Sequence, residues 1–200
     1  MVVTISNEYG SGGVAVAHAV AQALGYTLVD EQLPVVVAKR LAVAPDDVEA
    51  TEDVRGGVFE RFLATLETST PELAPGALTP SFDRECVLEL QDAVRDAAAD
   101  GNCVIVGRGA SAILHPMPGL LRVFLHAERT LRIARVMDAL HLDVKGATRE
   151  VERIDKARHG YMQRWYNQRW GAPEHYDVSI NTSLFGVQGS AEIIVCAVLR

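Results

Sequence analysis

Near the N-terminus, three glycines within four residues separate an apolar run from an alanine-rich stretch that is closed by Gly25. The apolar run, residues 2–6, predicts a strand, and the alanine-rich residues 14–24 predict a helix. A glycine-rich turn between a strand and a helix directs backbone N–H groups and the positive helix end toward an anion. This pattern predicts a phosphate or nucleotide site, although a turn that only needs positive φ and close packing would share it. The residues predicted to form the site are Gly10, Ser11, Gly12, Gly13, Val14 and Ala15.

The usual phosphate-loop pattern, G-x-x-x-x-G-K-[ST], is only partly present. Asn7 takes the place of the first glycine, Gly13 that of the lysine, and Val14 or Ala15 that of the hydroxyl residue. The lysine normally reaches the β- and γ-phosphates, and the hydroxyl binds Mg²⁺. The turn thus keeps the backbone cradle and lacks both side-chain functions.

Arg108 stands between two glycines, directly after the apolar run 103–106. In a parallel sheet, ligands bind beyond the carboxyl ends of the strands, and Arg108 is predicted to lie there. A guanidinium group binds phosphate through two parallel hydrogen bonds. We therefore expect Arg108 to contact a phosphate, the alternative being a salt bridge on the surface.

A second group of basic residues follows with helical spacing. Arg129, Arg132 and Arg135 are three residues apart, and Asp155 and Arg158 lie in a later polar stretch. Phosphoryl transfer spreads negative charge over the phosphate oxygens, so a set of arginines that closes over the substrate would stabilise it. Solvated helix faces with ion pairs between neighbouring turns are the alternative.

Asp30 follows the second predicted strand, residues 26–29, at the same edge of the sheet. Its carboxylate could orient a nucleotide, hold Mg²⁺ through water, or cap the next helix. These alternatives remain open. The cysteines show no C-x-x-C or Cys/His spacing, so no structural metal site is expected.

The composition is that of an ordinary globular protein, with 48% hydrophobic and 22% charged residues. A net charge of −7 argues against non-specific binding to nucleic acids, whose phosphates need a basic surface. The N-terminus does not resemble a secretion signal, and no apolar run approaches the length of a membrane helix. Cys103 and Cys196 lie in apolar runs and are expected to be buried, reduced thiols, so we expect a cytoplasmic protein without membrane contact.

Short β-branched runs alternate with helical patterns, which predicts an α/β fold with a parallel sheet between helices. The later strands are predicted at residues 103–106, 121–126 and 177–181, and the helices at 85–99, 130–140, 148–168 and 190–199. Two stretches interrupt the alternation, an insert over residues 31–80 and an arginine-rich segment over residues 141–171. We expect both to cover the carboxyl edge of the sheet within a single domain, residues 1–200.

Four segments, in order over nearly the whole chain, make the sequence similar to the cytidylate kinase-like family of nucleoside monophosphate kinases. The first is the glycine turn, residues 5–17, and the second is the strand that leads into Asp30. The third joins residues 104–109 to residues 121–135, and the fourth lies in several pieces between residues 153 and 183. The insert is the poorly matched part.

This resemblance implies a three-layer P-loop NTPase-type fold in which about five parallel strands are flanked by helices. It also implies transfer of the ATP γ-phosphate, with Mg²⁺ as cofactor, to a pyrimidine nucleoside monophosphate, CMP or dCMP. The insert would bind this acceptor, and residues 141–171 would form a helical lid. By the same resemblance, residues 10–13 would hold the donor phosphates and Arg108 the acceptor phosphate. The residues implied to clamp the transferring group are Arg132, Arg135 and Arg158, with Asp155 orienting the lid.

Three positions depart from the family pattern. Asn7 and Val14 stand where the family usually has arginine, and Gly13 stands where cytidylate kinase itself has lysine. Loss of one charge-stabilising contact can remove much of the transition-state stabilisation, unless guanidinium groups from later segments replace the charge. Two alternatives to the kinase therefore remain: a nucleotide-binding protein without turnover, and a phosphotransferase with a non-nucleotide acceptor. A homo-oligomer is also left open.

Overall fold

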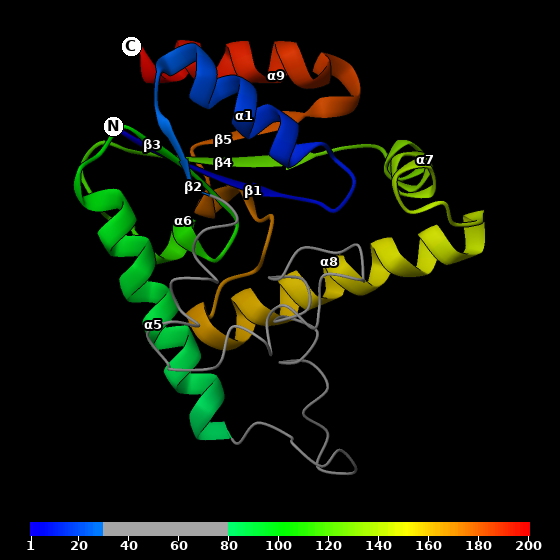
Figure 1. The fold of residues 1–200 in the computed structure, drawn as a ribbon, viewed down its shortest axis with the longest axis horizontal. Helices are drawn as coiled ribbons and strands as arrows, with labels where there is room; N and C mark the ends of the chain where they lie inside the picture. Colours follow the sequence, from blue (N-terminus) through cyan, green and yellow to red (C-terminus); the bar gives the residue numbers. More distant parts are fainter. Residues whose placement is uncertain (30–79) are drawn as a thin grey trace.

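The computed structural model describes residues 1–29 and 80–200, which form a five-stranded parallel sheet with helices on both faces (Figure 1). The strands are β1 (Val2–Asn7), β2 (Thr27–Val29), β3 (Cys103–Val106), β4 (Leu120–His126) and β5 (Val178–Asn181). Their order across the sheet is β2-β3-β1-β4-β5, so β1 is central and pairs in parallel with β3 and β4. The predicted α/β fold with a parallel sheet of about five strands is confirmed.

The helices form two layers around this sheet (Figure 1). One layer contains α1 (Gly13–Leu24) and α9 (Thr182–Val198), and the other contains α5 (Pro80–Ala99), α6 (Ala110–Ile113) and α8 (Val144–Tyr166). Helix α7 (Arg129–Leu140) packs against α8 through a small apolar cluster, and the short helix η1 (Pro173–His175) precedes β5.

The two layers are held to the sheet by side chains that alternate along β1. Val3 and Ile5 are fully buried beneath α1 and α9, whereas Val2 belongs to the cluster under α5 and α8. Because both faces are covered, the strands need no polar face, which explains their continuous apolar runs. Burying each such side chain contributes about 1.5–3 kcal/mol, so β1 is firmly fixed and its carboxyl end is a rigid support.

Local signals set the ends of the helices near that edge. Gly12, with φ of 87°, precedes α1, and Gly25, with φ of 66°, ends it through hydrogen bonds to the last turn. The Asp143 side chain caps α8 by accepting a hydrogen bond from the Gly146 N–H. Asn181 caps α9 in the same way at Ser183.

Most predicted elements are confirmed to within a few residues, but two expectations near the C-terminus are wrong. The sequence predicts the last helix from residue 190, whereas α9 begins at Thr182. Gly186 (φ 64°) kinks the helix and interrupts its period, so the pattern does not reveal the turns before it. Cys196 is exposed, unlike Cys103. The buried face of α9 passes through Ala191, Ile194 and Val198, and residue 196 falls outside it.

Asp30 and almost all of the predicted insert, residues 31–80, lie outside the described residues. In the part of the chain that the structure describes, no helix is long and apolar enough to traverse a lipid bilayer.

Candidate functional site

The loop from Asn7 to Gly12 joins the carboxyl end of the central strand to α1. Gly10 and Gly12 have φ of 78° and 87°, values that favour glycine. A Cβ on Gly10 would stand 2.7 Å from the backbone oxygen of Arg132. The glycine therefore allows α7 to approach the loop backbone closely.

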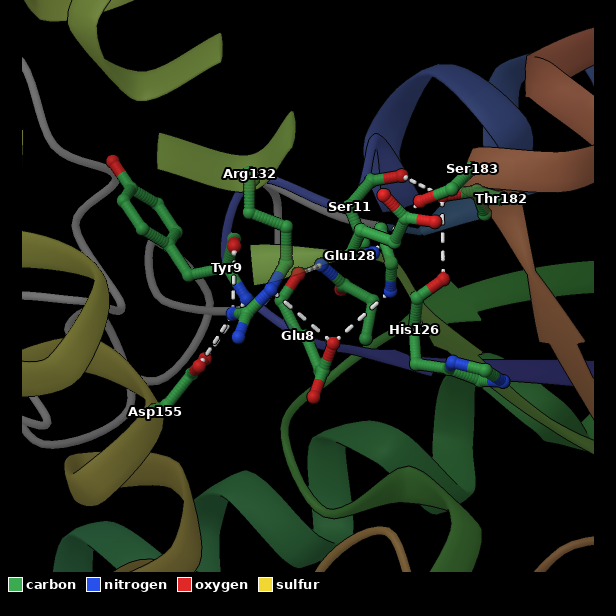
Figure 2. Close-up of polar contacts among 12 residues, drawn as sticks. Glu8, Tyr9, Ser11, His126, Glu128, Arg132, Asp155, Thr182 and Ser183 are labelled. Carbon is green, nitrogen blue, oxygen red and sulfur yellow. Dashed lines mark hydrogen bonds and ion pairs between the residues drawn. The ribbon is translucent and has the colours of Figure 1, made fainter. Parts of the chain in front are cut away.

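The carbonyl groups of this loop are held from outside by side chains of three helices, α7, α8 and α9. The pairs, donor first, are Arg158 Nη1 with Asn7 (2.5 Å), Arg132 Nη1 with Tyr9 (3.1 Å), Arg135 Nη1 with Gly10 (3.2 Å) and Thr182 Oγ1 with Ser11 (2.7 Å). Figure 2 shows the pairs made by Arg132 and Thr182. The Glu8 carbonyl accepts hydrogen bonds from within the loop, from Asn7 Nδ2 and the Ser11 N–H. Every carbonyl from Asn7 to Ser11 is thus satisfied.

Most amide groups of the loop and of the first turn of α1, by contrast, lack hydrogen-bond partners among the described residues. The described residues offer no acceptor to the N–H groups of Gly10, Gly12, Gly13, Val14 and Ala15. The Ser11 hydroxyl is fully buried and also lacks a hydrogen-bond partner among them. The buried Ser11 hydroxyl costs about 1–3 kcal/mol while it is unpaired, and an anion at the N-terminus of α1 would accept hydrogen bonds from it and from several amides at once. The loop can therefore bind a phosphate group.

Arg132, on α7, is the buried cation of the site, with a side chain 8% exposed. Its Nη1 lies 2.5 Å from Asp155 Oδ2 on α8, and its Nε lies 3.3 Å from Glu8 Oε2 (Figure 2). The other oxygen of Asp155 accepts a hydrogen bond from the Tyr9 N–H (2.9 Å), and Glu8 Oε2 accepts one from the Ala127 N–H (3.0 Å). In this arrangement Arg132 and Asp155 fix the loop to α7 and α8, and Arg132 directs Nη1 and Nε to protein groups.

Arg135, one turn further along α7, has a different environment. Its Nη1 donates to the Gly10 carbonyl and stands 3.5 Å from the position that a Cβ on Gly12 would take. No carboxylate of the described residues pairs with it. Arg158, on α8, lies with its guanidinium carbon 5.8 Å from the ring centroid of Tyr9. Two guanidinium groups therefore flank the loop, and the charge of Arg135 is not neutralised by an acid of the described chain.

Positions 13 and 14, at the start of α1, are the two at which a basic side chain could reach a phosphate on the loop. A Cβ on Gly13 would stand 2.4 Å from Asn7 Cγ, so the Asn7 side chain fills the space that a side chain at position 13 would need. Val14 is 49% exposed in the first turn of α1. Position 14 is therefore the accessible one, and valine provides neither a charge nor a hydroxyl there.

Arg108 lies beyond the end of β3, beside the loop, where the Gly107 N–H donates to the Ile5 carbonyl of β1. Gly107, Arg108 and Gly109 all have positive φ, of 65°, 60° and 70°. This conformation costs an arginine roughly 1–2 kcal/mol, and such strain is typical of functional sites. The Arg108 side chain is buried. Burial raises the pKa of Tyr161 well above its ordinary value, an effect that the nearby charge of Arg108 opposes.

The structure thus brings Arg132, Arg135, Arg158 and Asp155 to the loop and places Arg108 one strand away. Sequence reasoning missed Glu8 and Thr182. A carboxylate at an anion site is unexpected, and only the fold shows that Glu8 binds Arg132 and the Ala127 N–H. Thr182 follows the cap residue of α9, a position whose polar side chain is the only signal that could have indicated it.

Mg²⁺ is the metal expected with ATP, and the described residues form no cluster that would bind it without the phosphates of a nucleotide. Among them no group of three His, Cys, Asp or Glu side chains could hold a metal ion. Glu8 and Asp155, which contact the loop, are engaged by Arg132 and by backbone N–H groups. Val14 and Ala15 have no hydroxyl. Asp30 stands outside the described residues.

The parallel sheet and the glycine loop between β1 and α1 define the fold of the P-loop kinases. An uncharacterized protein from Eubacterium ventriosum has a similar structure, with a TM-score of 0.71 and 21% identity, over 100% of this chain and 99% of that one. Shikimate kinase from Bacteroides thetaiotaomicron is similar with a TM-score of 0.56 and 13% identity, over 100% and 99% of the two chains. At these identities, both similarities are evidence for a shared fold alone.

The chain belongs to the cytidylate kinase-like family, whose model matches residues 2–184, and the resemblance seen in the sequence is confirmed. A uronate isomerase from Corynebacterium glutamicum is 26% identical over 139 residues, which make up 68% of this chain and 27% of that protein. The chain therefore spans about a quarter of the length of that relative.

Proposed function

We propose that this protein transfers the γ-phosphate of ATP to a nucleoside monophosphate, with CMP or dCMP as the acceptor. The observation that carries the proposal is the set of unpaired loop amides next to the guanidinium group of Arg135. Membership of the cytidylate kinase-like family supports the acceptor class. Amides and a cation at the end of a central strand suit the donor phosphates of ATP.

In this mechanism the loop amides bind the donor phosphates, while Arg135 and Arg158 supply the charge that a lysine supplies in other phosphate loops. Arg132 and Asp155 keep the loop in place. Arg108 holds the acceptor phosphate, one oxygen of which attacks the γ-phosphorus as the bond to the bridging oxygen of ADP breaks. Mg²⁺ enters only as the counter-ion that ATP carries. Positioning and electrostatic stabilisation are thus the contributions of the protein.

The loop also supports a version of the proposal without turnover. Asn7 covers position 13, and Val14 leaves position 14 uncharged, so no side chain of the loop itself reaches the transferring phosphate with a positive charge. Removal of one such contact typically costs about 10²–10³ in kcat. In this version the protein binds nucleotide and releases it unchanged.

The third candidate is a phosphotransferase whose acceptor is a hydroxylated carboxylic acid. Guanidinium binds carboxylate and phosphate with the same two-bond geometry, so Arg108 suits either anion. The match with part of a uronate isomerase, an enzyme named for a sugar acid, favours this candidate over other non-nucleotide acceptors.

A coupled assay of ADP release separates these candidates. It would contain ATP and Mg²⁺ with CMP, dCMP, UMP, AMP, glucuronate or shikimate, and Arg108→Ala would be the control. Turnover with a nucleotide above this control supports the first candidate, and turnover only with an acid supports the third. Calorimetric binding of ATP without any turnover indicates the version that only binds. A protein that neither binds ATP nor releases ADP would refute all three.

A further inference from the structure

Helix α8 contacts both halves of the proposed site. Its middle residues Asp155 and Arg158 bind the loop backbone at Tyr9 and Asn7. Its last turns carry Tyr161 and Tyr166, which lie beside the turn that holds Arg108. From Asp155 to Tyr166 the helix advances about 16 Å, at roughly 1.5 Å per residue. One continuous helix therefore reaches from the donor loop to the acceptor arginine.

The contact between Tyr166 and the Arg108 turn is made at Gly109. A Cβ on Gly109 would stand 2.7 Å from Tyr166 Cε2 and 3.0 Å from its hydroxyl oxygen. The phenol ring therefore occupies the place of a side chain at this position. Gly109 is required twice, because its φ of 70° also favours glycine.

Tyr166 is itself held by its neighbours on α8 and α5. Its hydroxyl oxygen lies 3.2 Å from that of Tyr161, and the two rings meet edge to face with centroids 5.7 Å apart. Burial raises the pKa of Tyr166, an effect opposed by the nearby side chains of Tyr161, Gln91 and Arg95. The ring thus has a fixed position from which it can support the Arg108 turn.

The Arg108 turn needs such support, because Arg108 itself has a positive φ of 60°, which is strained for a residue with a Cβ, whereas the glycines on either side adopt it freely. Strained backbone persists only where its surroundings determine it. The Tyr166 ring packs on Gly109, the residue that follows Arg108. Tyr161 lies close enough to Arg108 for the charge of the guanidinium to oppose the rise in the pKa of the Tyr161 phenol.

We propose that Tyr166 is a positioning residue of the acceptor site: it holds the turn 107–109 against α8 and so fixes the Arg108 guanidinium relative to the phosphate loop. This inference rests on the proposed binding of the acceptor by Arg108. It means that α8 sets the separation between the two phosphate groups that react.

Three variants of the full chain test the role of Tyr166. Tyr166→Leu removes the ring, Tyr166→Phe keeps the ring and removes only the hydroxyl contact, and Gly109→Ala displaces the ring from the other side. The first readout is the NMR signal of the Arg108 Nε–H group, which reports the order of the guanidinium and needs no acceptor. The second is calorimetric affinity for CMP, with affinity for ADP as the internal control.

We expect Tyr166→Leu and Gly109→Ala to broaden or shift the Arg108 signal and to weaken CMP binding about tenfold, while ADP binding changes less than about twofold. Tyr166→Phe should remain close to the wild-type protein in each measurement. An Arg108 signal that is unchanged in both Tyr166→Leu and Gly109→Ala would overturn the inference. Should Tyr166→Leu fail to fold, as judged by its thermal transition, Tyr166→Met, which removes the ring and fills more of its volume, decides.

A separate titration keeps this inference distinct from the proposed function. CMP and inorganic phosphate would be added to the wild-type protein while the Arg108 signal is followed. If neither moves the signal, Arg108 does not bind the acceptor phosphate and the proposed function loses its acceptor site. The comparison of variants still decides whether Tyr166 positions Arg108.

Discussion

Arg132 Nη1 lies 2.5 Å from Asp155 Oδ2 and 3.1 Å from the Tyr9 carbonyl oxygen, so one nitrogen joins α7, α8 and the phosphate loop. Glu8 binds the same guanidinium group at Nε. The two helices that follow β4 are thereby fixed to the loop that follows β1. Because the guanidinium is buried, its removal would leave two carboxylates without a countercharge.

We therefore predict that Arg132→Ala lowers the free energy of unfolding by about 2–4 kcal/mol, since breaking a buried pair leaves uncompensated charge. The matched control is Arg129→Ala on the same helix, whose ion pair with Glu152 is solvent-exposed and should be worth only about 0–1 kcal/mol. Urea unfolding followed by circular dichroism measures both. Equal losses for the two variants would show that the Arg132 network does not stabilise the fold.

Arg135→Gln should weaken ADP binding about tenfold or more, because a hydrogen bond from a charged group contributes about 1.5–3 kcal/mol. The thermal transition should fall by only a few degrees, since the hydrogen bond to the Gly10 carbonyl is lost but no acid of the described residues pairs with Arg135. Arg149→Gln, at an exposed position of α8, is the control for loss of charge. Calorimetry that gives the same affinity for both variants would exclude Arg135 from the donor site.

Val14→Lys should tighten ADP binding roughly fivefold to tenfold, because position 14 is exposed beside the unpaired amides and an ammonium there would face the phosphates. Val14→Gln, similar in length and uncharged, should leave the affinity near that of the wild type. If the lysine variant binds no better than the glutamine variant, the phosphates of ADP do not lie beside position 14.

Removal of divalent metal should change ADP affinity by less than about threefold, since the described residues form no group of three acidic, histidine or cysteine side chains that would hold Mg²⁺ beside the phosphates. Parallel titrations in EDTA and in Mg²⁺ measure this. A large loss in EDTA that Asp30→Asn reproduces in Mg²⁺ would place the metal at Asp30 and contradict the prediction.

The part of the fold that could be predicted depends on local patterns, and the part that could not depends on distant pairing. The β-branched runs and the glycine turn mark strands and the start of a helix through backbone preferences, so the sheet and the loop could be predicted from local sequence. Spacing placed Arg132 and Arg135 on one helix but could not show that Glu8, 124 positions earlier, neutralises only the first. The packing of Tyr166 on Gly109 likewise joins residues with no shared local pattern.

Acidification should weaken the junction between β4 and β5. The Arg122 side chain binds both carboxylate oxygens of Asp177, and its hydrogen bonds lower the pKa of Asp177 below the ordinary value. A carboxyl group with a lowered pKa in the folded state stabilises the protein above its unfolded pKa, about 3.9, and this contribution disappears as pH falls through the folded value. The difference in unfolding free energy between wild type and Asp177→Asn should therefore shrink as pH falls below about 5 and Asp177 becomes protonated in the folded protein. A constant difference across this range would contradict the assignment.

The contact between Asn7 and position 13 also limits how this loop can change. Because the carboxamide group occupies the volume in front of Gly13, a side chain introduced there alone would meet it at 2.4 Å. Residues 7 and 13 are therefore expected to be epistatic, because a lysine at position 13 requires the Asn7 side chain to move or to be shortened. Directed evolution from this chain is thus expected to introduce a new cation at position 14, where one substitution suffices.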